Sequence, residues 1–305
     1  MPPVAIVDIG TNSTRLLVAA IDDGRVEAEL ERRSTVTRLG AGVDSDGRLR
    51  DDAMQRVYDT LDEYRALIDK HDAGTAKAVL TSAVRDAANG QEFADTVRDR
   101  YGLEPHVLTG DQEAALTFLG ATSERDPDDP TTVLVIDIGG GSTEFVIGTG
   151  RQARFHVSNQ AGVVRQTERH FHTDPPADAE IENLAGDVRS IIEQGVPAEH
   201  REAVSHAIAV AGTATSLASI AQGLVPYDPD RVEGYVLTDA ERKALQDRLA
   251  SIPLEQRKRV LGLDPARAPT IVAGAVILGE VMRLFGLGQV EVSERDILRG
   301  AALGL

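Results

Sequence analysis

The chain has 305 residues, enough for two domains, and its hydrophobic and charged contents are those of an ordinary globular protein. Its net charge of -17 argues against a general nucleic-acid or membrane-surface binder, and the absence of cysteine excludes disulfides and thiol catalysis. The first residues lack the pattern of a secretory signal, and no apolar run reaches the ~18 residues of a membrane span, so we expect a cytoplasmic protein.

The first part of the chain predicts an alternation of strands and helices. Val4–Val7 and Arg15–Ile21 are predicted strands on either side of the turn DIGTNST. The remaining strands are expected at 26–37, 76–81 and 106–108, and helices at 51–71, 90–101 and 111–122.

A polar segment with two prolines, Ser123–Thr132, predicts a boundary between a first domain, residues 1–125, and a second domain, residues 126–305. After it the strand–turn–strand pattern restarts. A strand at 207–211 is expected to lead into a third glycine turn, Gly212–Ser216, and then a helix. Two further helices are expected at 269–285 and 296–303.

The two predicted domains contain an internal repeat. Asp8 and Asp137 lie 129 positions apart (137 − 8), and at this offset DIG falls on DIG, Ser-Thr falls on Ser-Thr, and the flanking apolar runs coincide. Arg15 falls on Glu144, which is the one sharp difference in polarity. One such motif is weak, but two copies in phase predict a duplicated domain.

The turns of the repeat contain more glycine and hydroxyl residues than a plain hairpin turn requires, although a plain hairpin is the alternative. Successive exposed N–H groups form a concave anion site, and Ser and Thr hydroxyls add donors. We call these turns the first and second cradles, and we expect them to bind phosphate. Their candidate residues are Gly10, Thr11, Asn12 and Ser13 in the first, and Gly139, Gly140, Gly141, Ser142 and Thr143 in the second.

An aspartate stands directly before each cradle, and its charge would repel a bare phosphate. We therefore expect a divalent cation between the aspartate and the phosphate oxygens. Asp137 and Glu144 are the candidates around this metal, with Asp8 as a weaker one. The alternative for Glu144 is a solvated partner of Arg15. The histidines of RHFH face apart on a helix and do not predict a metal site.

The two cradles, the linker and VAGTATS (Val210–Ser216) resemble the actin, sugar kinase and Hsp70 superfamily. Within it, DIGTNSTRLLV, IDIGGGSTE, TSAVRDAANG and TGDQEAALTFLGA resemble the exopolyphosphatase and guanosine pentaphosphate phosphatase family. RQTERHF and HTDPP also recur in that family. The resemblance covers essentially the whole chain, and it implies an α/β fold of duplicated ribonuclease-H-like domains with an interdomain cleft that closes on the substrate.

The resemblance implies roles for particular residues. Glu113 would be the catalytic general base, and Arg85 would bind the phosphate tail of the substrate, with Gly212 and Thr213 as further substrate-binding candidates. The alternatives are a surface acid favoured by a helix N-terminus for Glu113, and a surface pair with Asp86 or Glu92 for Arg85. Arg38 is a weaker candidate for a phosphate contact.

The implied activity is hydrolysis of the terminal phosphoanhydride bond of inorganic polyphosphate, with Mg²⁺ or Mn²⁺. A guanosine pentaphosphate phosphatase, a kinase of the superfamily and a non-catalytic phosphate sensor remain alternatives. The resemblance also implies a homodimer.

Two features depart from the family pattern. Family members often have three acids before the alanine of the Glu113 segment, whereas Gln112 stands among them here. Longer members carry a further helical region that this chain does not show, so we expect low processivity on long polyphosphate.

Overall fold

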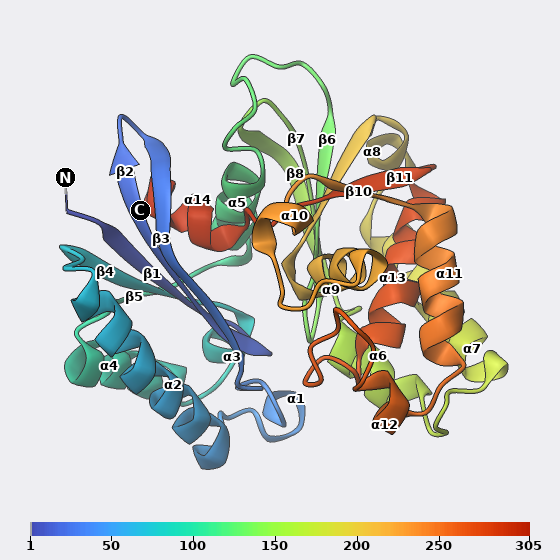
Figure 1. The fold of residues 1–305 in the computed structure, drawn as a ribbon, viewed down its shortest axis with the longest axis horizontal. Helices are drawn as coiled ribbons and strands as arrows, with labels where there is room; N and C mark the ends of the chain where they lie inside the picture. The colour runs from blue at the N-terminus through green and yellow to red at the C-terminus, as the bar shows by residue number, and fades with distance from the viewer. Residues whose placement is uncertain (1) are drawn as a thin grey trace. The chain divides into compact units, whose positions relative to one another are not determined.

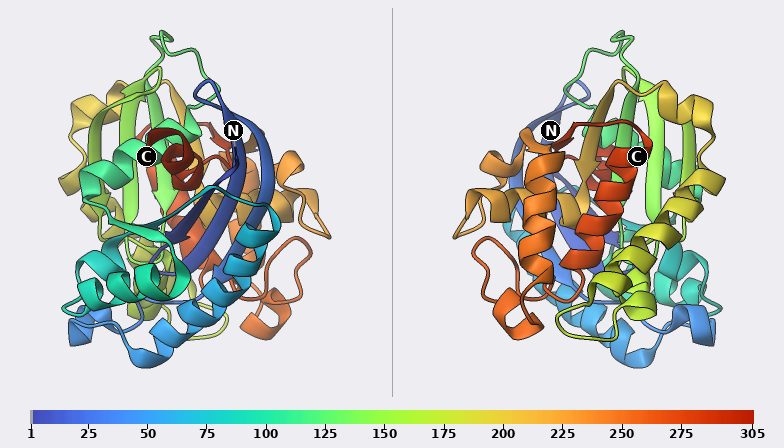
Figure 2. Two further views of the ribbon diagram at one scale, coloured as in Figure 1. Left: turned by 90° about the vertical axis from the view of Figure 1, so that its left-hand side faces the viewer. Right: turned by 90° about the vertical axis from the view of Figure 1, so that its right-hand side faces the viewer.

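The computed structural model describes residues 2–305, apart from the side chain of residue 44, and it divides into two compact units. Unit 1 comprises Met1–Glu124 together with Arg295–Leu305, and unit 2 comprises Arg125–Glu294. The prediction placed the last segment in the second domain. It groups with unit 1 because the C-terminal helix α14 (Ile297–Gly304) packs against α5 (Gly110–Ala121) (Figure 2, left).

Unit 1 is built on a mixed five-stranded sheet with the order β3-β2-β1-β4-β5. The first three strands are antiparallel, and β4 and β5 continue parallel to β1. The strands are β1 (Val4–Ile9), β2 (Ser13–Asp22), β3 (Arg25–Val36), β4 (Thr75–Leu80) and β5 (Glu104–Val107).

Helices cover both faces of this sheet because β1 is apolar at successive positions (Figure 1). Val7 and Ile9 pack with α2 and α4, whereas Ile6 packs with α5 and α14. The helices are α1 (Val43–Asp46), α2 (Asp51–Lys70), α3 (Ser82–Arg85), α4 (Gly90–Tyr101), α5 and α14.

Unit 2 has a similar architecture, built on a six-stranded sheet of order β10-β11-β9-β6-β7-β8. Its core β8-β7-β6-β9-β11 has the same order and directions as the sheet of unit 1, and β10 adds an antiparallel edge. The strands are β6 (Val133–Ile138), β7 (Thr143–Thr149), β8 (Gln152–Asn159), β9 (His206–Val210), β10 (Tyr235–Thr238) and β11 (Gln289–Val292). The predicted duplicated ribonuclease-H-like α/β fold is therefore confirmed.

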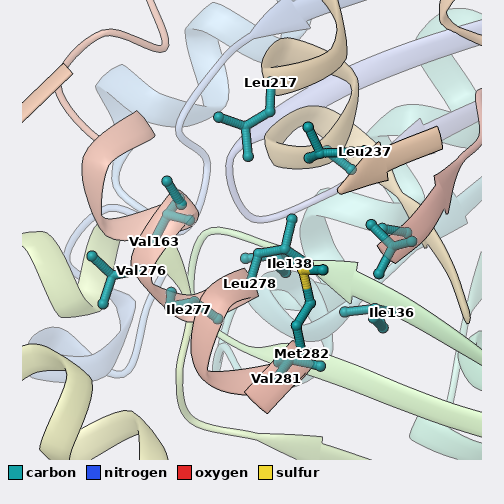
Figure 3. Close-up of a cluster of buried hydrophobic side chains, with 14 of the residues drawn as sticks. Ile136, Ile138, Val163, Leu217, Leu237, Val276, Ile277, Leu278, Val281 and Met282 are labelled. Carbon is teal, nitrogen blue, oxygen red and sulfur yellow. The ribbon is translucent and has the colours of Figure 1, made fainter. Parts of the chain in front are cut away.

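One apolar core joins the sheet of unit 2 to its long helices. Ile136 and Ile138 of β6 lie with Leu217 of α9 and with Ile277 and Met282 of α13 (Figure 3). Helices α7, α11 and α13 lie together on one side of the sheet (Figure 2, right). The helices are α6 (Val163–His170), α7 (Asp178–Gly195), α8 (Ala198–Glu202), α9 (Ala211–Gln222), α10 (Pro229–Val232), α11 (Asp239–Ala250), α12 (Leu254–Arg257) and α13 (Ile271–Leu284).

One local prediction was wrong. Gly212–Ser216 does not form a turn before a helix, because α9 already begins at Ala211. Ala211 takes a positive φ of 62°, which allows the chain to pass directly from β9 into the helix. Among the described residues, no helix is long and apolar enough to cross a membrane.

A close glycine contact holds α14 against α5. A Cβ atom built on Gly120 would lie 1.9 Å from the carbonyl oxygen of Asp296, and one on Gly300 would lie 1.8 Å from that of Leu116. We expect Gly120→Ala to lower the free energy of unfolding by about 1–3 kcal/mol, because backbone would have to move in a packed contact. Denaturant unfolding measures this. Gly110→Ala in the same helix is the control, since nothing lies within 4 Å of that position, and equal stability of the two variants would contradict the contact.

Glu180 holds the loop before α7 by accepting hydrogen bonds from the hydroxyl of Thr173 and the amides of Ala177 and His172. These bonds lower the pKa of Glu180 to about 2 from an ordinary value of 4.5. The unfolded chain takes up this proton near pH 4.5 and the folded chain only near pH 2, so the stabilisation is present above pH 4.5 and is lost as the pH falls toward 2.

We therefore expect Glu180→Gln to melt at a lower temperature than the wild type at pH 7, and the difference to shrink below pH 4.5. Thermal unfolding across this pH range measures the effect. Glu182→Gln, an exposed position on the same helix, is the control. An equal difference at pH 7 and pH 3 would show that the Glu180 carboxylate does not act through its charge.

Candidate functional site

The first cradle connects β1 to β2, and amides of residues 37–40 donate hydrogen bonds to its carbonyl groups. The amide of Gly10 donates to Ser13 O at 3.0 Å. The amide of Gly40 donates to Thr11 O, and the amides of Thr37 and Arg38 both donate to Asn12 O. Since C=O and N–H point in opposite directions across a trans peptide, the amides of Asn12 and Ser13 point away from residues 37–40.

The second cradle, between β6 and β7, has the same closing bond, from the amide of Gly139 to Ser142 O at 2.9 Å. Here the start of α6 has the role that residues 37–40 have at the first cradle. The amides of residues 162–165 donate to the carbonyl oxygens of Gly139, Gly140 and Gly141. The amides of Gly140, Gly141 and Ser142 consequently point away from α6. Three successive N–H groups turned the same way are the arrangement of an anion nest.

Three hydroxyl groups of the cradles, those of Thr11, Ser142 and Thr143, already have partners. Thr11 Oγ1 lies 2.9 Å from the hydroxyl of Ser82, which begins α3. Ser142 Oγ donates to Glu144, and the fully buried Thr143 donates to Ala161 O at 2.8 Å. The Thr143 hydroxyl therefore fixes the cradle to the segment before α6.

Unit 1 brings Arg85 and Glu113 together. Arg85 Nη1 lies 3.3 Å from Glu113 Oε2 and donates to Leu108 O at 3.0 Å, and its Nε donates to Asp86 at 3.3 Å. The alternative surface pair with Asp86 is thus present together with the contact to Glu113. Through Ser82 and Thr11, the helix that carries Arg85 is also bonded to the first cradle.

Glu113 lies in the first turn of α5, where its side chain remains 20% exposed. Gln112 fills the reciprocal position of a capping box, in which Thr109 accepts from the Gln112 amide and the Gln112 side chain accepts from the Thr109 amide. The glutamine that departs from the family pattern therefore caps the N-terminus of α5 and points back to the backbone of Thr109.

The acids at the two cradles differ in their surroundings. Asp8 is buried, and its Oδ2 accepts from Arg15 Nε and Nη2 at 2.9 and 2.6 Å. Arg15 also pairs with Asp296, the N-cap of α14. Burial raises the pKa of Asp8 although Arg15 opposes this. Within the described part of the chain, Asp8 Oδ1 has no hydrogen-bond partner.

In unit 2, Asp137 and Glu144 are directly opposite each other on β6 and β7. Two like charges in such a cross-strand position destabilise a sheet unless a cation lies nearby. Glu144 Oε1 also accepts from the hydroxyls of Ser142 and Ser158. No group of three or more His, Cys, Asp or Glu side chains able to hold a metal ion exists in residues 2–305 as described. Mg²⁺ is commonly held by one or two carboxylates together with water and substrate phosphates, so this oxygen-rich pair fits it.

Two arginines that contact predicted site residues, Arg165 at Gly141 and Arg267 at Gly212, were not themselves predicted. Arg165 Nε donates to Gly141 O at 3.0 Å, and the guanidinium of Arg267 lies over Gly212, 1.4 Å from where a Cβ would be. Gly212 and the buried Thr213 lie in the first turn of α9. The sequence shows no signal for Arg267, whereas Arg165 could have been found from its place shortly after the second cradle's strand pair. The side chain of Arg38 is exposed.

Comparison with known proteins identifies the family. Residues 17–303 match the model of the Ppx/GppA phosphatase family. The chain belongs to this family. It is 35% identical to exopolyphosphatase 2 of Mycobacterium tuberculosis over 99% of this chain and 98% of that protein.

Solved structures of the family agree with this result. A Ppx/GppA family member from Aquifex aeolicus is 34% identical, with a TM-score of 0.83 over 99% of this chain and 96% of that chain. An exopolyphosphatase from Cytophaga hutchinsonii is 26% identical, with a TM-score of 0.86 over 98% of this chain and 96% of that chain. The family resemblance seen in the motifs is thereby confirmed over nearly the whole chain.

Proposed function

We propose that this chain is an exopolyphosphatase, a hydrolase that releases orthophosphate from the end of inorganic polyphosphate. The observation that carries the proposal lies in unit 1. There, an amide cradle is bonded through Thr11 to the helix of Arg85, and Arg85 lies 3.3 Å from Glu113. This arrangement joins anion donors, a cation and an acid that could act as a base. The Mycobacterium tuberculosis relative is named exopolyphosphatase 2, which supports the same substrate.

The first step is binding of the phosphate chain. The outward-turned amides of the cradles donate to phosphate oxygens, and Arg85 adds charge-assisted hydrogen bonds. Without substrate the Arg85 charge is balanced by Glu113 and Asp86. A phosphate competes for the Arg85 guanidinium, and this frees the Glu113 carboxylate to act as a general base. That one phosphate chain is shared by the cradles of both units remains a prediction from the sequence.

Glu113 is the proposed general base. It accepts a proton from a water molecule, the water oxygen forms a bond to the terminal phosphorus, and the bond from that phosphorus to the bridging oxygen breaks. The electron pair stays on the bridging oxygen of the shortened chain, and orthophosphate leaves. The location of Glu113 in the first turn of α5 keeps the carboxylate partly exposed, so that water reaches it.

Asp137 and Glu144 are the proposed holders of Mg²⁺, with Mn²⁺ as an alternative. When bound, the metal neutralises charge that develops on the phosphate oxygens. Asp8 fits this role less well, because Arg15 already balances its charge. The hydroxyls of Ser142 and Ser158 orient Glu144 toward one position.

The proposal is tested by measuring orthophosphate release with Mg²⁺ from long polyphosphate, short polyphosphate, guanosine pentaphosphate and ATP. We expect the highest kcat/KM with polyphosphate. A clear preference for guanosine pentaphosphate would replace the proposal by a nucleotide phosphatase. No release from any of the four would overturn a hydrolase. A homodimer, a cytoplasmic location and low processivity remain predictions of the sequence.

A further inference from the structure

The loop between α3 and α4 contains a buried asparagine, Asn89, whose side chain bonds to the backbone of a residue 40 positions away. Its Oδ1 accepts from the amide of Leu49 at 2.8 Å, and its Nδ2 donates to Leu49 O at 3.0 Å. Asn89 directly precedes α4, where an asparagine commonly caps the helix, but its side chain makes no capping hydrogen bond. Its amide group therefore serves the contact with Leu49 and not the end of its own helix.

Leu49 ends a segment that reaches the first cradle. We call residues 37–49 the outer segment. Three amides at its start donate to carbonyl groups of the first cradle. Its middle is held by hydrogen bonds from the Val43 amide to Gly40 O and from the Gly47 amide to Val43 O. At its far end, Gly47 O accepts from the amide of Ala88 at 2.9 Å. The outer segment thus contacts the cradle with one end and the loop of Asn89 with the other.

The loop of Asn89 also lies against α3, which carries Arg85. A Cβ atom built on Gly90 would lie 1.9 Å from Val84 O, so the start of α4 touches the residue next to Arg85. At its other end, α3 is bonded to the first cradle through the hydroxyl of Ser82. Arg85 is therefore tied to the cradle by two connections, the hydroxyl pair and the outer segment with Asn89 at its end.

We propose that Asn89 is a positioning residue for substrate binding, which fixes Arg85 relative to the first cradle through the outer segment. The ligand of Arg85 is the phosphate chain of the substrate, so the inference rests on the proposed function. A guanidinium meets two phosphate oxygens only in a fixed orientation, and small displacements of a positioned group are costly. A buried amide that donates and accepts satisfies both backbone groups of Leu49, which would otherwise lack partners.

The test is a double-mutant cycle of Asn89→Leu and Arg85→Gln. Leucine is close to asparagine in size, makes neither hydrogen bond and adds no charge. Gln91→Leu is the matched control, because Gln91 is an exposed amide in the first turn of α4 that donates to Asp95. The measurements are kcat and KM for orthophosphate release from long polyphosphate with Mg²⁺. A second readout is the rise in melting temperature that tripolyphosphate and Mg²⁺ produce together.

We expect Asn89→Leu to raise KM roughly threefold to tenfold with kcat changed much less, which is within the coupling found between residues of one hydrogen-bond network. Arg85→Gln should raise KM by roughly tenfold or more, the usual loss for a charge-assisted hydrogen bond. With Arg85 already replaced, Asn89→Leu should raise KM little further, because the group that it positions is gone. Gln91→Leu should match the wild type.

Two results would overturn the inference. One is an unchanged KM in Asn89→Leu. The other is a KM in the double variant that equals the product of the two separate increases, because Asn89 would then stabilise unit 1 without placing Arg85.

Asn89→Asp is a second variant for the case that leucine prevents folding. It keeps the bond from the Leu49 amide and loses the donor to Leu49 O. Gln91→Glu controls for the added charge. The cycle with Arg85→Gln is expected to give the same shared increase in KM, and independent increases would again overturn the inference.

The two readouts separate this inference from the proposed function. If the wild type releases no orthophosphate but is stabilised by tripolyphosphate, the cycle is measured on that stabilisation. A shared loss then supports the role of Asn89 although the hydrolase is overturned. If polyphosphate is hydrolysed and the two increases in KM are independent, the proposed function holds and the inference is overturned. A wild type that neither releases orthophosphate nor is stabilised overturns both.

Discussion

Replacing Glu113 by glutamine is expected to lower kcat for orthophosphate release by roughly 10²–10⁴-fold, the usual contribution of a general base. Glutamine has nearly the same shape and can still approach Arg85, so the fold and the substrate KM should change little. It cannot accept the proton from water, so the chemical step loses its base. Steady-state kinetics with polyphosphate and Mg²⁺ measure both constants.

Glu92→Gln is the matched control, because Glu92 is an exposed acid in the first turn of another helix, α4. It reproduces the loss of a helix-terminal charge without touching the site. If both variants keep full kcat, Glu113 is only a favourable acid at a helix N-terminus, which is the alternative that the sequence left open. A variant that loses kcat together with its fold would be recognised by its melting temperature.

Replacing Gly162 by alanine is expected to lower kcat/KM by roughly 10²-fold or more. A Cβ atom at this position would lie 2.3 Å from Gly140 O and 2.3 Å from the carbonyl carbon of Gly141. The second cradle would have to move away from α6, and its outward-turned amides would move with it. Misplacing one preorganised donor to a developing charge commonly costs that much. The clash involves backbone, so a rotamer change cannot relieve it.

Gly186→Ala is the control for this variant, since nothing lies within 4 Å of that position in the middle of α7. Alanine is the better helix former by about 1 kcal/mol, so this control should be at least as stable as the wild type. The measurements are kcat/KM for orthophosphate release and the melting temperature of Gly162→Ala and Gly186→Ala. Normal kcat/KM in Gly162→Ala would show that the second cradle does not need its position against α6.

The sequence determined the repeat and much of the local structure. Apolar runs on both sides of DIG-containing turns are sufficient to predict the first two strands of each sheet, because buried strands and glycine turns have strong local signals. The helical spacing at 51–71 likewise predicted α2. The short strands β10 and β11 were not predicted, because segments of four residues carry little periodicity.

Long-range contacts were decided by the tertiary structure. The assignment of α14 to unit 1 depends on the fit of Gly120 against Asp296 and Gly300, which are about 180 residues away along the chain. The contact between Arg85 and Glu113 likewise depends on how β4, α3 and α5 pack.

The sequence by itself predicts which residues could bind phosphate, since successive N–H groups in a glycine-rich turn between strands can form an anion site. The tertiary structure decided which way their amides point. Segments elsewhere in the chain accomplish this: residues 37–40 in unit 1 and the start of α6 in unit 2 bond to the carbonyl groups and turn the N–H groups outward. A hydrogen-bond partner far along the chain leaves no local signal, so this part of the site could be known only from the folded chain.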